Sequence, residues 1–409
     1  MLESGSLMGA DFVGMLLGEL GADVIKLEAP QSGDYLRDIL GQIVPHHSPA
    51  HLQFNGGKRS IALDLKNAAA LPIFWRLLST TDVFVDGNVA GVCDRLGIGY
   101  AAQRRLKPDI VYCQNTGFGA EGPYADIPMH GEMMTAAAAA RPVAMGSDGL
   151  VERAQPPPGL FSAETGGHGP AAAGFTSALY ITSALAYRAS SGRGSRIDVS
   201  GVQSVIAHAA VATTYALNDH RIRDRNSMPE RDRGRLFGAK YQFYQTKDAK
   251  YVMLGCIEPK FWKRFCEGVD RPDLAERNDN PEVPVDWGGG QDDLRPEVQG
   301  IIQTRTLDDW MSFASLHRLP ICPAYGDIRE LAGDPQLGYR GAFQNGTHPV
   351  AGDFSYLAEP ARVEGQAYEL GHPAPTLGEH TVPLLLELGI SSQEIDALAR
   401  AGAIKDGRP

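Results

Sequence analysis

The stretch Leu17-Gly18-Glu19-Leu20-Gly21-Ala22-Asp23-Val24-Ile25-Lys26-Leu27-Glu28 decides the fold class, because it joins the end of a helix to a buried strand. Upstream of it, apolar residues recur at helical spacing over residues 10–20, and Gly21 ends that helix. Ala22–Glu28 has the short apolar pattern of a strand. In an open α/β sheet a strand also precedes the first helix. Met1–Met8 must supply it, so either this strand is short or the native start lies upstream.

The same alternation of strands and helices continues to about residue 217. The pattern predicts strands at 61–65, 82–85, 110–114 and 196–200, and helices at 68–78, 103–106, 132–140, 170–190 and 202–217. Helices separated by short apolar strands indicate a mostly parallel sheet with both faces covered. The early glycines do not match G-x-G-x-x-G, so a dinucleotide-binding fingerprint is rejected.

The second half of the chain is organised differently. Asn218–Arg235 is densely charged and is predicted to be a linker or an exposed loop. Tyr241–Gly255 has the pattern of a hairpin, and 259–266 that of a helix. Thr306 and Asp309 form a predicted capping box for a helix over 307–317. Further segments are predicted as a loop (282–291) and as two C-terminal helices (380–388 and 392–401).

Composition narrows the class of protein. A chain of 409 residues is too long for one small core, which favours two domains. With 43% hydrophobic and 21% charged residues, the composition is that of an ordinary soluble globular protein. The net charge of -11 argues against a general nucleic-acid binder, although it permits a local basic pocket for a phosphorylated ligand.

Cysteine and histidine usage gives no metal site. The five cysteines lie far apart and form no C-x-x-C pair, which is typical of a reducing compartment. The only histidine cluster is His46-His47 with His51, a weak indication of metal binding. There is neither an apolar run of the roughly 20 residues that span a bilayer nor a signal-peptide pattern. We therefore expect a cytoplasmic protein without membrane, nucleic-acid or metal binding.

The region from Thr116 to Glu164 is the best candidate for a site. It opens with the glycine- and proline-rich turn Thr116–Pro123 and contains His130, Glu132 and Glu164, which can transfer protons or attack a carbonyl. A predicted helix over 132–140 places His130 and Glu132 at its N-terminus, where backbone N–H groups point outward. Most histidines and glutamates in loops are merely solvated. These residues alone therefore indicate only an α/β enzyme with a site near this loop.

The stretch Leu17–Glu28 resembles the class III CoA-transferase family, also called the CaiB/BaiF family. This family includes formyl-CoA transferase, crotonobetainyl-CoA:carnitine CoA-transferase and α-methylacyl-CoA racemase. Further matching motifs follow in the family's order and cover essentially the whole chain: Gly33-Asp34 with Arg37, 58–66, 94–100, 117–123, Gly192-Arg193-Gly194 before 197–199, 304–306 with Asp309-Trp310, and 375–380.

The resemblance implies an α/β fold with a Rossmann-like large domain, a mostly parallel sheet and a smaller α+β domain. The implied regions are 1–217 for the large domain, 218–325 for the linker and small domain, and 326–409 for a C-terminal segment that returns to the large domain. It also implies an interlocked homodimer, although a heteromer with a related chain is possible. The ligand implied is an acyl-CoA thioester, which is a substrate, and no permanently bound cofactor is expected.

The resemblance also implies where coenzyme A binds. The matching positions are Leu63, Asp64, Leu65, Lys66, Asn88 and Arg95, with Arg95 near a phosphate. A cation there suits a polyanionic ligand. Two departures from the family pattern bear on affinity: Ala29 stands where the family often has arginine, and Asp86-Gly87-Asn88 stands where it often has Glu-Asn-Phe.

The reaction type depends on the catalytic positions that the resemblance implies. The aspartate nucleophile of the transferases, counted from the Gly-Pro of the glycine-rich turn, falls on Gly131, and Glu132 is the adjacent carboxylate. The two bases of the racemases fall on His130 and Glu164, and their small-domain glutamate falls on Glu258.

Three functions therefore stay open. CoA transfer to a carboxylic acid is favoured as the majority activity of the family, and it needs a carboxylate nucleophile. Racemisation of an α-methylacyl-CoA needs two opposed bases and donors for the enolate oxygen, and His130 and Glu164 fit that pair. The third possibility is a non-catalytic CoA-binding subunit of a heteromeric CoA transferase. The acyl group cannot be named from the sequence.

Overall fold

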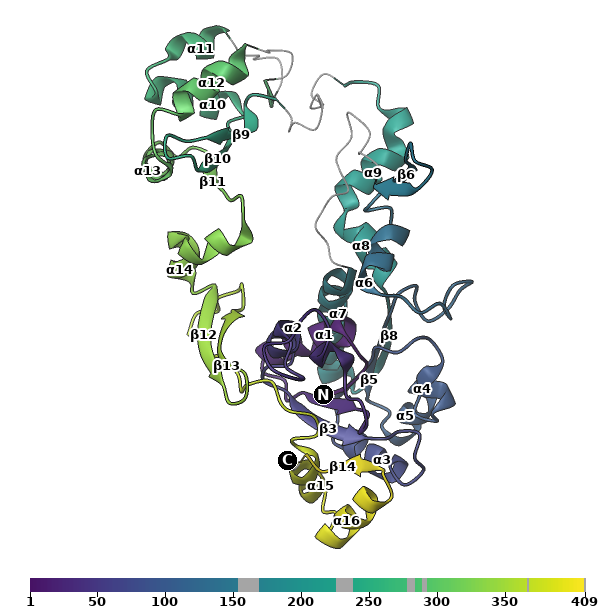
Figure 1. Ribbon diagram of the computed structural model, residues 1–409. Coiled ribbons are helices and arrows are strands. Elements are labelled where there is room, and N and C mark those ends of the chain that lie inside the picture. Colours follow the sequence, from purple (N-terminus) through teal and green to yellow (C-terminus); the bar gives the residue numbers. More distant parts are fainter. Residues whose placement is uncertain (154–168, 226–237, 278–283, 289–292, 366–367, 408–409) are drawn as a thin grey trace. The chain divides into compact units, whose positions relative to one another are not determined.

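The computed structural model describes residues 1–153, 169–225, 238–277, 284–288, 293–365 and 368–407. The chain divides into two compact units. The large unit comprises Met1–Val151, Ala163–Ala210 and Gly341–Pro409, and the small unit comprises Glu152–Ser162 and Val211–Arg340. Figure 1 shows the helices and strands of both units.

A seven-stranded sheet forms the centre of the large unit, with the strand order β14-β3-β2-β1-β4-β5-β8. Neighbouring strands are parallel except at β14, which pairs antiparallel with β3. The predicted α/β class with a mostly parallel sheet is thus confirmed, and β1 is indeed a short strand. The bounds are β1 Leu2–Ser4, β2 Ile25–Glu28, β3 Arg59–Leu63, β4 Val83–Asp86, β5 Val111–Thr116, β8 Ser195–Ser200 and β14 Ile404–Lys405.

Helices cover both faces of this sheet (Figure 1). The helices of the large unit are α1 Met8–Glu19, α2 Pro49–Phe54, α3 Leu71–Ser79, α4 Val92–Arg95, α5 Tyr100–Leu106, α6 Gly131–Ala137, α7 Gly169–Ser191, α8 Gly201–His208, α15 Thr381–Glu387 and α16 Ser392–Arg400, with the 3-10 turn η1 Tyr35–Arg37. The prediction of one helix over 202–217 is wrong, because α8 ends before Ala209 and α9 runs from Ala210 to Asn218. Ala209 makes a turn there, with ψ 28° instead of a helical value.

The two faces of the sheet bury separate apolar clusters. Beneath α3, α15 and α16, Leu2, Phe74 and Phe84 belong to one cluster, and all three are 0% exposed. Beneath α1 and α7, Val13, Val85 and Ile181 belong to the other. Strands of a parallel sheet covered on both faces are apolar along most of their length, which explains the continuous apolar runs in the sequence.

Charged side chains also lie inside the large unit, next to α1. Lys26 Nζ lies 3.1 Å from Glu3 Oε1 and 2.8 Å from Asp34 Oδ2, and it also pairs with Asp11. Burial alone would lower the pKa of Lys26, but these three carboxylates and that of Glu28 raise it well above its usual value. A side chain at Gly14 of α1 would collide with Glu3, so this glycine leaves room for the ion pairs under the helix.

The C-terminal segment is bound along the edge of the sheet at β3. Arg37 forms an ion pair with Glu28 at 2.7 Å and donates to the backbone oxygen of Pro375 at 2.9 Å. Ser60 Oγ accepts from Gly378 N at 2.9 Å, and Ala62 N donates to Thr381 Oγ1 at 3.0 Å. These bonds hold residues 375–381 beside β3, and β14 then pairs with β3 through Ile404 and Leu63.

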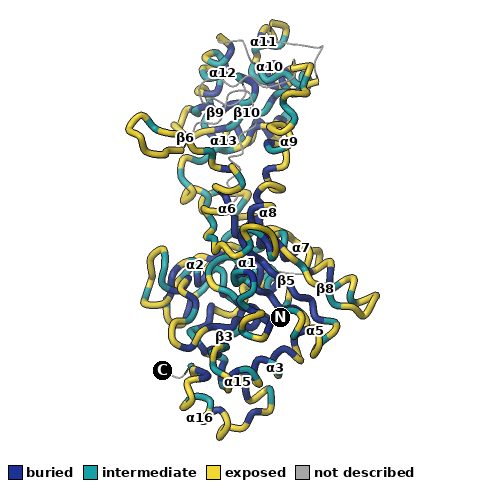
Figure 2. The backbone as a smooth tube through the Cα atoms, turned by 90° about the vertical axis from the view of Figure 1, so that its right-hand side faces the viewer, coloured by how far each residue is buried: buried dark blue, intermediate teal, exposed yellow. Residues whose placement is uncertain are grey.

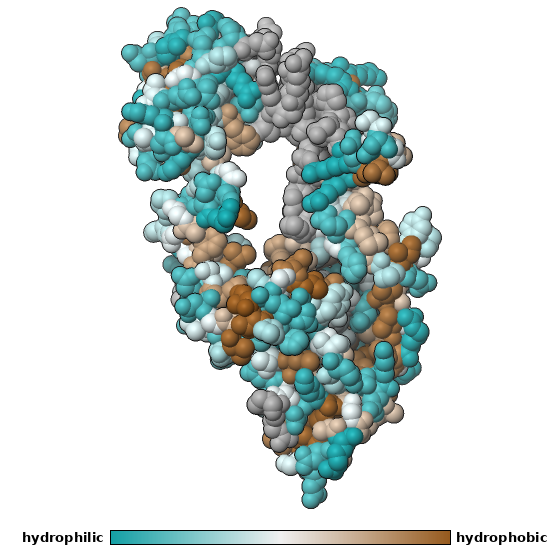
Figure 3. All heavy atoms as spheres, viewed as in Figure 1, coloured by the Kyte–Doolittle hydropathy of each residue, from teal (hydrophilic) through white to brown (hydrophobic). Residues whose placement is uncertain are grey.

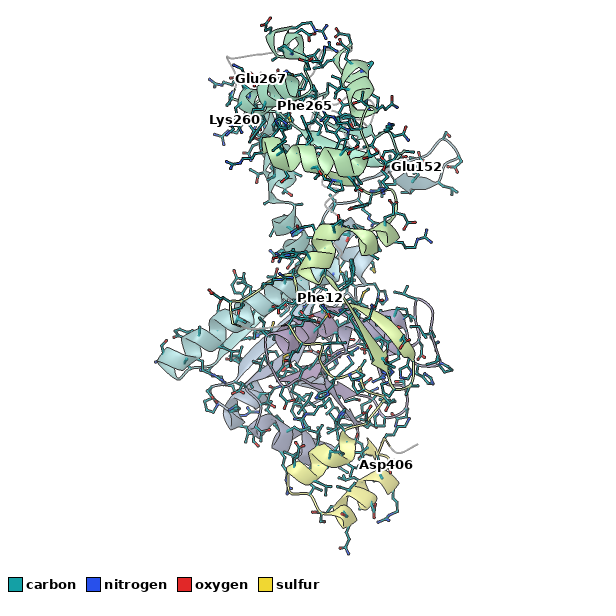
Figure 4. All side chains as sticks on the ribbon, turned by 90° about the vertical axis from the view of Figure 1, so that its left-hand side faces the viewer. Phe12, Glu152, Lys260, Phe265, Glu267 and Asp406 are labelled. Atoms are coloured by element: carbon teal, nitrogen blue, oxygen red, sulfur yellow. The ribbon has the colours of Figure 1, made fainter. Side chains whose placement is uncertain are left out.

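The small unit has its own core. Its three-stranded antiparallel sheet has the order β11-β10-β9, and the predicted 241–255 hairpin is confirmed as β9 and β10. Trp262 stacks on Phe265 of α10, whereas Lys260 and Glu267 of the same helix are exposed (Figure 4). The predicted capping box of Thr306 is confirmed. The bounds are β9 Tyr241–Gln245, β10 Tyr251–Gly255, β11 Ile321–Ala324, α10 Pro259–Gly268, α11 Pro272–Arg277, α12 Leu294–Ile302, α13 Leu307–His317, α14 Pro335–Arg340, η2 Asp219–Arg221 and η3 Ile328–Gly333.

The structure also contains two β-hairpins. β12 (Phe343–His348) pairs with β13 (Gly352–Leu357), and β6 (Val143–Met145) pairs with β7 (Val151–Arg153). Every residue of β6 and β7 is exposed. Within the described part of the chain, no helix combines the length and the apolar character needed to cross a membrane.

Candidate functional site

The carboxyl ends of the parallel strands meet at one edge of the large sheet. The strand order reverses between β1 and β4, and in open α/β sheets ligands bind outside the carboxyl ends of the strands at such a reversal. Most of the sequence-predicted residues of the large unit follow these ends. Lys66 follows β3, Asn88 follows β4, and the glycine-rich turn after Thr116 follows β5.

The turn that follows β5 is held in place by its neighbour β8. Thr116 lies opposite Ser200 in the register of the two strands. Asp198 accepts a hydrogen bond from Ala120 N at 2.9 Å, and Thr116 Oγ1 accepts one from Gly119 N at 3.0 Å. Gly119 has φ 98°, a left-handed conformation that favours glycine. The turn is therefore fixed by side chains of two strands.

His130 and Glu132 lie at the start of α6, as the sequence predicts. His130 is the N-cap residue, with φ -101° and ψ 168°, and Glu132 lies in the first turn. Glu132 Oε2 is 2.9 Å from Arg141 Nη1, and the two side chains are 64% and 46% exposed. The sequence does not point to Arg141, because nothing in the local pattern distinguishes an arginine beyond a helix end from any other surface cation.

The start of α6 packs closely against the start of α7. A Cβ atom built on Gly131 would lie 2.7 Å from Pro170 Cδ, so the position matched to the family aspartate has no room for a side chain as the chain is folded here. A Cβ atom built on Gly117 of the preceding turn would lie 2.7 Å from Met129 Cβ. The turn after β5, the entry of α6 and the entry of α7 thus form one packed region.

The remaining predicted catalytic residues are Glu258 and Glu164. Glu258 belongs to the small unit, where it is the N-cap residue of α10. Glu164 lies outside the described residues.

The predicted CoA-contacting residues have different surroundings. Leu63 is 2% exposed and packs in the apolar core, and its strand also pairs with β14. Asp64 accepts from Lys66 N at 3.0 Å, and the Lys66 side chain is exposed. Leu65 packs against the edge of the same core.

Asn88 belongs to a polar cluster at the ends of β1 and β4. Its Nδ2 donates to Asp86 Oδ1 at 3.0 Å and to Ser4 Oγ at 3.3 Å, while Tyr112 OH donates to Asp86 Oδ2 at 2.6 Å. Burial and the Asp86 carboxylate raise the pKa of Tyr112 far above its usual range, so the phenol stays protonated. Arg95, the last residue of α4, is exposed.

The side chains of this edge suit proton transfer and the binding of a polar ligand. They include a histidine, exposed carboxylates, an amide held by two neighbours and exposed cations. Among the residues that the structure describes, no group of three His, Cys, Asp or Glu side chains could hold a metal ion.

Comparisons with known proteins identify the family. The model of CoA-transferase family III matches residues 1–381. The chain is 26% identical to the succinyl-CoA:glutarate CoA-transferase of Homo sapiens, over 99% of this chain and 88% of that protein. It is also 26% identical to the succinyl-CoA–L-malate CoA-transferase beta subunit of Chloroflexus aurantiacus, over 97% of this chain and 95% of that protein.

The crystal structure of a CaiB/BaiF family protein from Brucella suis has a similar fold, with a TM-score of 0.70 and 23% identity over 95% of this chain and 97% of that one. The resemblance expected from the sequence motifs is thus confirmed over nearly the whole length of the chain. This protein belongs to CoA-transferase family III, an enzyme family that acts on CoA thioesters.

Proposed function

We propose that this protein is a CoA transferase that moves coenzyme A between an acyl-CoA thioester and a carboxylic acid. The observation that carries this proposal is the family match over residues 1–381, together with full-length relatives whose names state this reaction.

The transfer needs a carboxylate of the enzyme. It attacks the thioester carbonyl and expels CoA thiolate, which leaves a mixed anhydride. The thiolate then attacks the carbonyl of the enzyme residue and releases the first carboxylic acid. The acceptor carboxylate then attacks the enzyme–CoA thioester and expels CoA thiolate, which leaves a second mixed anhydride. The thiolate attacks the acyl carbonyl of this anhydride, so that a new acyl-CoA forms and the enzyme carboxylate is restored.

Two glutamates are candidates for this carboxylate. Glu132 is exposed at the start of α6, and its ion pair with Arg141 can open at low cost because both partners face solvent. Glu164 precedes the first residue of α7 by five positions in the sequence, and α7 begins against Gly131. Either glutamate would compensate for the absence of a side chain at position 131.

The test combines two readouts in deuterated water. The purified protein is mixed with a panel of acyl-CoA thioesters and carboxylic acids, and products are followed by mass spectrometry. New acyl-CoA on the acceptor is expected, together with an enzyme–CoA thioester in the intact mass. Peptide mapping of that thioester then distinguishes Glu132 from Glu164, and the matching Glu→Gln variant should lose both signals.

Racemisation of an acyl-CoA is the second candidate. It is favoured by one observation: His130 occupies the N-cap of α6, and the next position, Gly131, has no room for a nucleophilic side chain. Deuterium at the α-carbon without acyl exchange, lost in His130→Gln, would establish this reaction and contradict CoA transfer.

Assembly is part of the proposal. Phe175, Leu179, Tyr180 and Tyr187 of α7 are each more than half exposed, and α7 has one buried side and one exposed side (Figure 2). Such an apolar stripe favours association with a second copy of the chain. Figure 3 shows further hydrophobic residues over α1 and α2, where Phe12 contacts Phe54.

Sedimentation of the purified protein should give a dimer. Activity that appears only with a related chain would establish a heteromer instead.

A further inference from the structure

Three helices of the large unit begin with a glycine and meet at these glycines. They are α6 at Gly131, α7 at Gly169 and α8 at Gly201. In each case the space that a Cβ atom would need is filled by a neighbouring helix. Pro170 fills it at Gly131, and Met134 of α6 fills it at Gly169 and Gly201.

The contact between Gly131 and Pro170 cannot be relieved by rotation of a side chain. A Cβ atom on Gly131 would lie 2.7 Å from Pro170 Cδ and 2.8 Å from Cγ, distances that real Cβ atoms essentially never show. A flexible side chain could rotate away, but the pyrrolidine ring is closed onto the backbone and cannot. A side chain at position 131 would therefore push the first turn of α6 away from α7.

The residues beside Gly131 are the ones that the proposed reaction needs. His130 precedes it and Glu132 follows it, so any shift of the backbone at position 131 moves both side chains. Residues that position reacting groups can control rate without touching the substrate, since a displacement of about 1 Å can cost roughly a hundredfold in rate.

We propose that Pro170 is a positioning residue that fixes the entry of α6, and that Gly131 is the residue that permits this contact. This inference rests on the proposed use of His130 or Glu132 in catalysis. It assigns a role to two residues that neither donate protons nor contact the reacting atoms. It also predicts that a carboxylate cannot be introduced at position 131 while Pro170 is present.

A double-mutant cycle tests the proposal. Gly131→Ala should lower kcat about tenfold or more while KM changes by no more than about twofold, because the substrate-binding residues elsewhere are untouched. Gly131→Ala/Pro170→Ala removes the ring and should recover most of the lost activity. Gly300→Ala is the control, since nothing lies within 4 Å of a Cβ built there, and it should behave as the wild type.

A spectroscopic readout separates this inference from the proposed function. The ¹³C-labelled imidazole signal of His130, assigned with His130→Gln, should shift in Gly131→Ala and return in the double variant, whichever reaction the enzyme catalyses. Wild-type activity and an unmoved His130 signal in Gly131→Ala would overturn the proposal. So would a double variant that folds and recovers neither signal nor activity. If Gly131→Ala does not fold, a double variant that also fails to fold would overturn the proposal.

Discussion

Lys26 lies directly opposite Glu3 in the register of β2 and β1, and its Nζ atom is 3.1 Å from Glu3 Oε1, with both side chains fully buried. The same ammonium group also pairs with Asp11 and Asp34. Its removal would break the ion pairs of the buried carboxylates Asp11 and Asp34, whereas Glu3 would keep its pair with Lys58 at 2.8 Å.

Lys26→Met should therefore be strongly destabilising. Breaking a buried ion pair by removing one partner costs about 3–5 kcal/mol, because an uncompensated charge stays buried. Urea unfolding followed by circular dichroism measures the change. Lys263→Met is the control, since Lys263 is 71% exposed, and it should stay within about 0.5 kcal/mol of the wild type. An unchanged midpoint in Lys26→Met would show that the network does not support the fold.

Glu19 should make stability depend on pH near neutrality. Burial at the end of α1 and the neighbouring carboxylate of Glu359 raise the pKa of Glu19 from 4.5 to about 7. The pKa of Glu19 is higher in the folded state than in the unfolded state. The contribution of Glu19 to the free energy of unfolding is therefore fully present below pH 4.5 and is lost as the pH rises through about 7. The wild type should thus lose stability relative to Glu19→Gln between these values.

Thermal unfolding at a series of pH values checks this expectation. Glu369→Gln is the control, since Glu369 is an exposed glutamate of the same unit, and its curve should run parallel to that of the wild type. A constant difference between wild type and Glu19→Gln over the whole pH series would contradict the prediction.

Asp198 should matter for activity through the turn that follows β5. Asp198→Ala removes the acceptor for Ala120 N, a bond of 2.9 Å, and should lower kcat/KM roughly tenfold, which corresponds to about 1.4 kcal/mol. Asp198→Asn keeps an oxygen in place and should be nearly as active as the wild type. Equal losses in both variants would indicate that the charge of Asp198, and not its hydrogen bond, is needed.

Arg95 is predicted to bind a phosphate of coenzyme A. Arg95→Ala should weaken acyl-CoA binding about tenfold, as expected for loss of a charge-assisted contact. The same acyl group on pantetheine, which lacks the nucleotide, should bind both proteins equally. Calorimetric titration measures the affinities, with the exposed Arg104 changed to alanine as the matched control. Equal losses for both ligands would place Arg95 away from the nucleotide.

Much of the fold could be predicted because its signals are local. The apolar spacing before Gly21, the strand around Ile25 and the capping box of Thr306 each depend on residues close in sequence, and the structure contains all three elements. The helix over 202–217 was predicted without its interruption, because no glycine or proline marks Ala209.

The candidate site could be predicted only as a set of residues. The sequence places His130 and Glu132 at a helix start because an alanine-rich segment follows them. It gives no indication that Arg141 pairs with Glu132, since the two are nine positions apart and outside any regular helical spacing. The identity of the carboxylate that takes part in the reaction stays a prediction.

The sequence by itself determined the family, the alternation of strands and helices and the chemical groups available for catalysis, since these follow from residue types and short spacings. Only the tertiary structure decided that β14 pairs with β3, that Lys26 forms ion pairs with three carboxylates and that Pro170 fills the space beside Gly131. These contacts join residues that are distant in the chain. Their geometry depends on how whole elements pack, which no local pattern records.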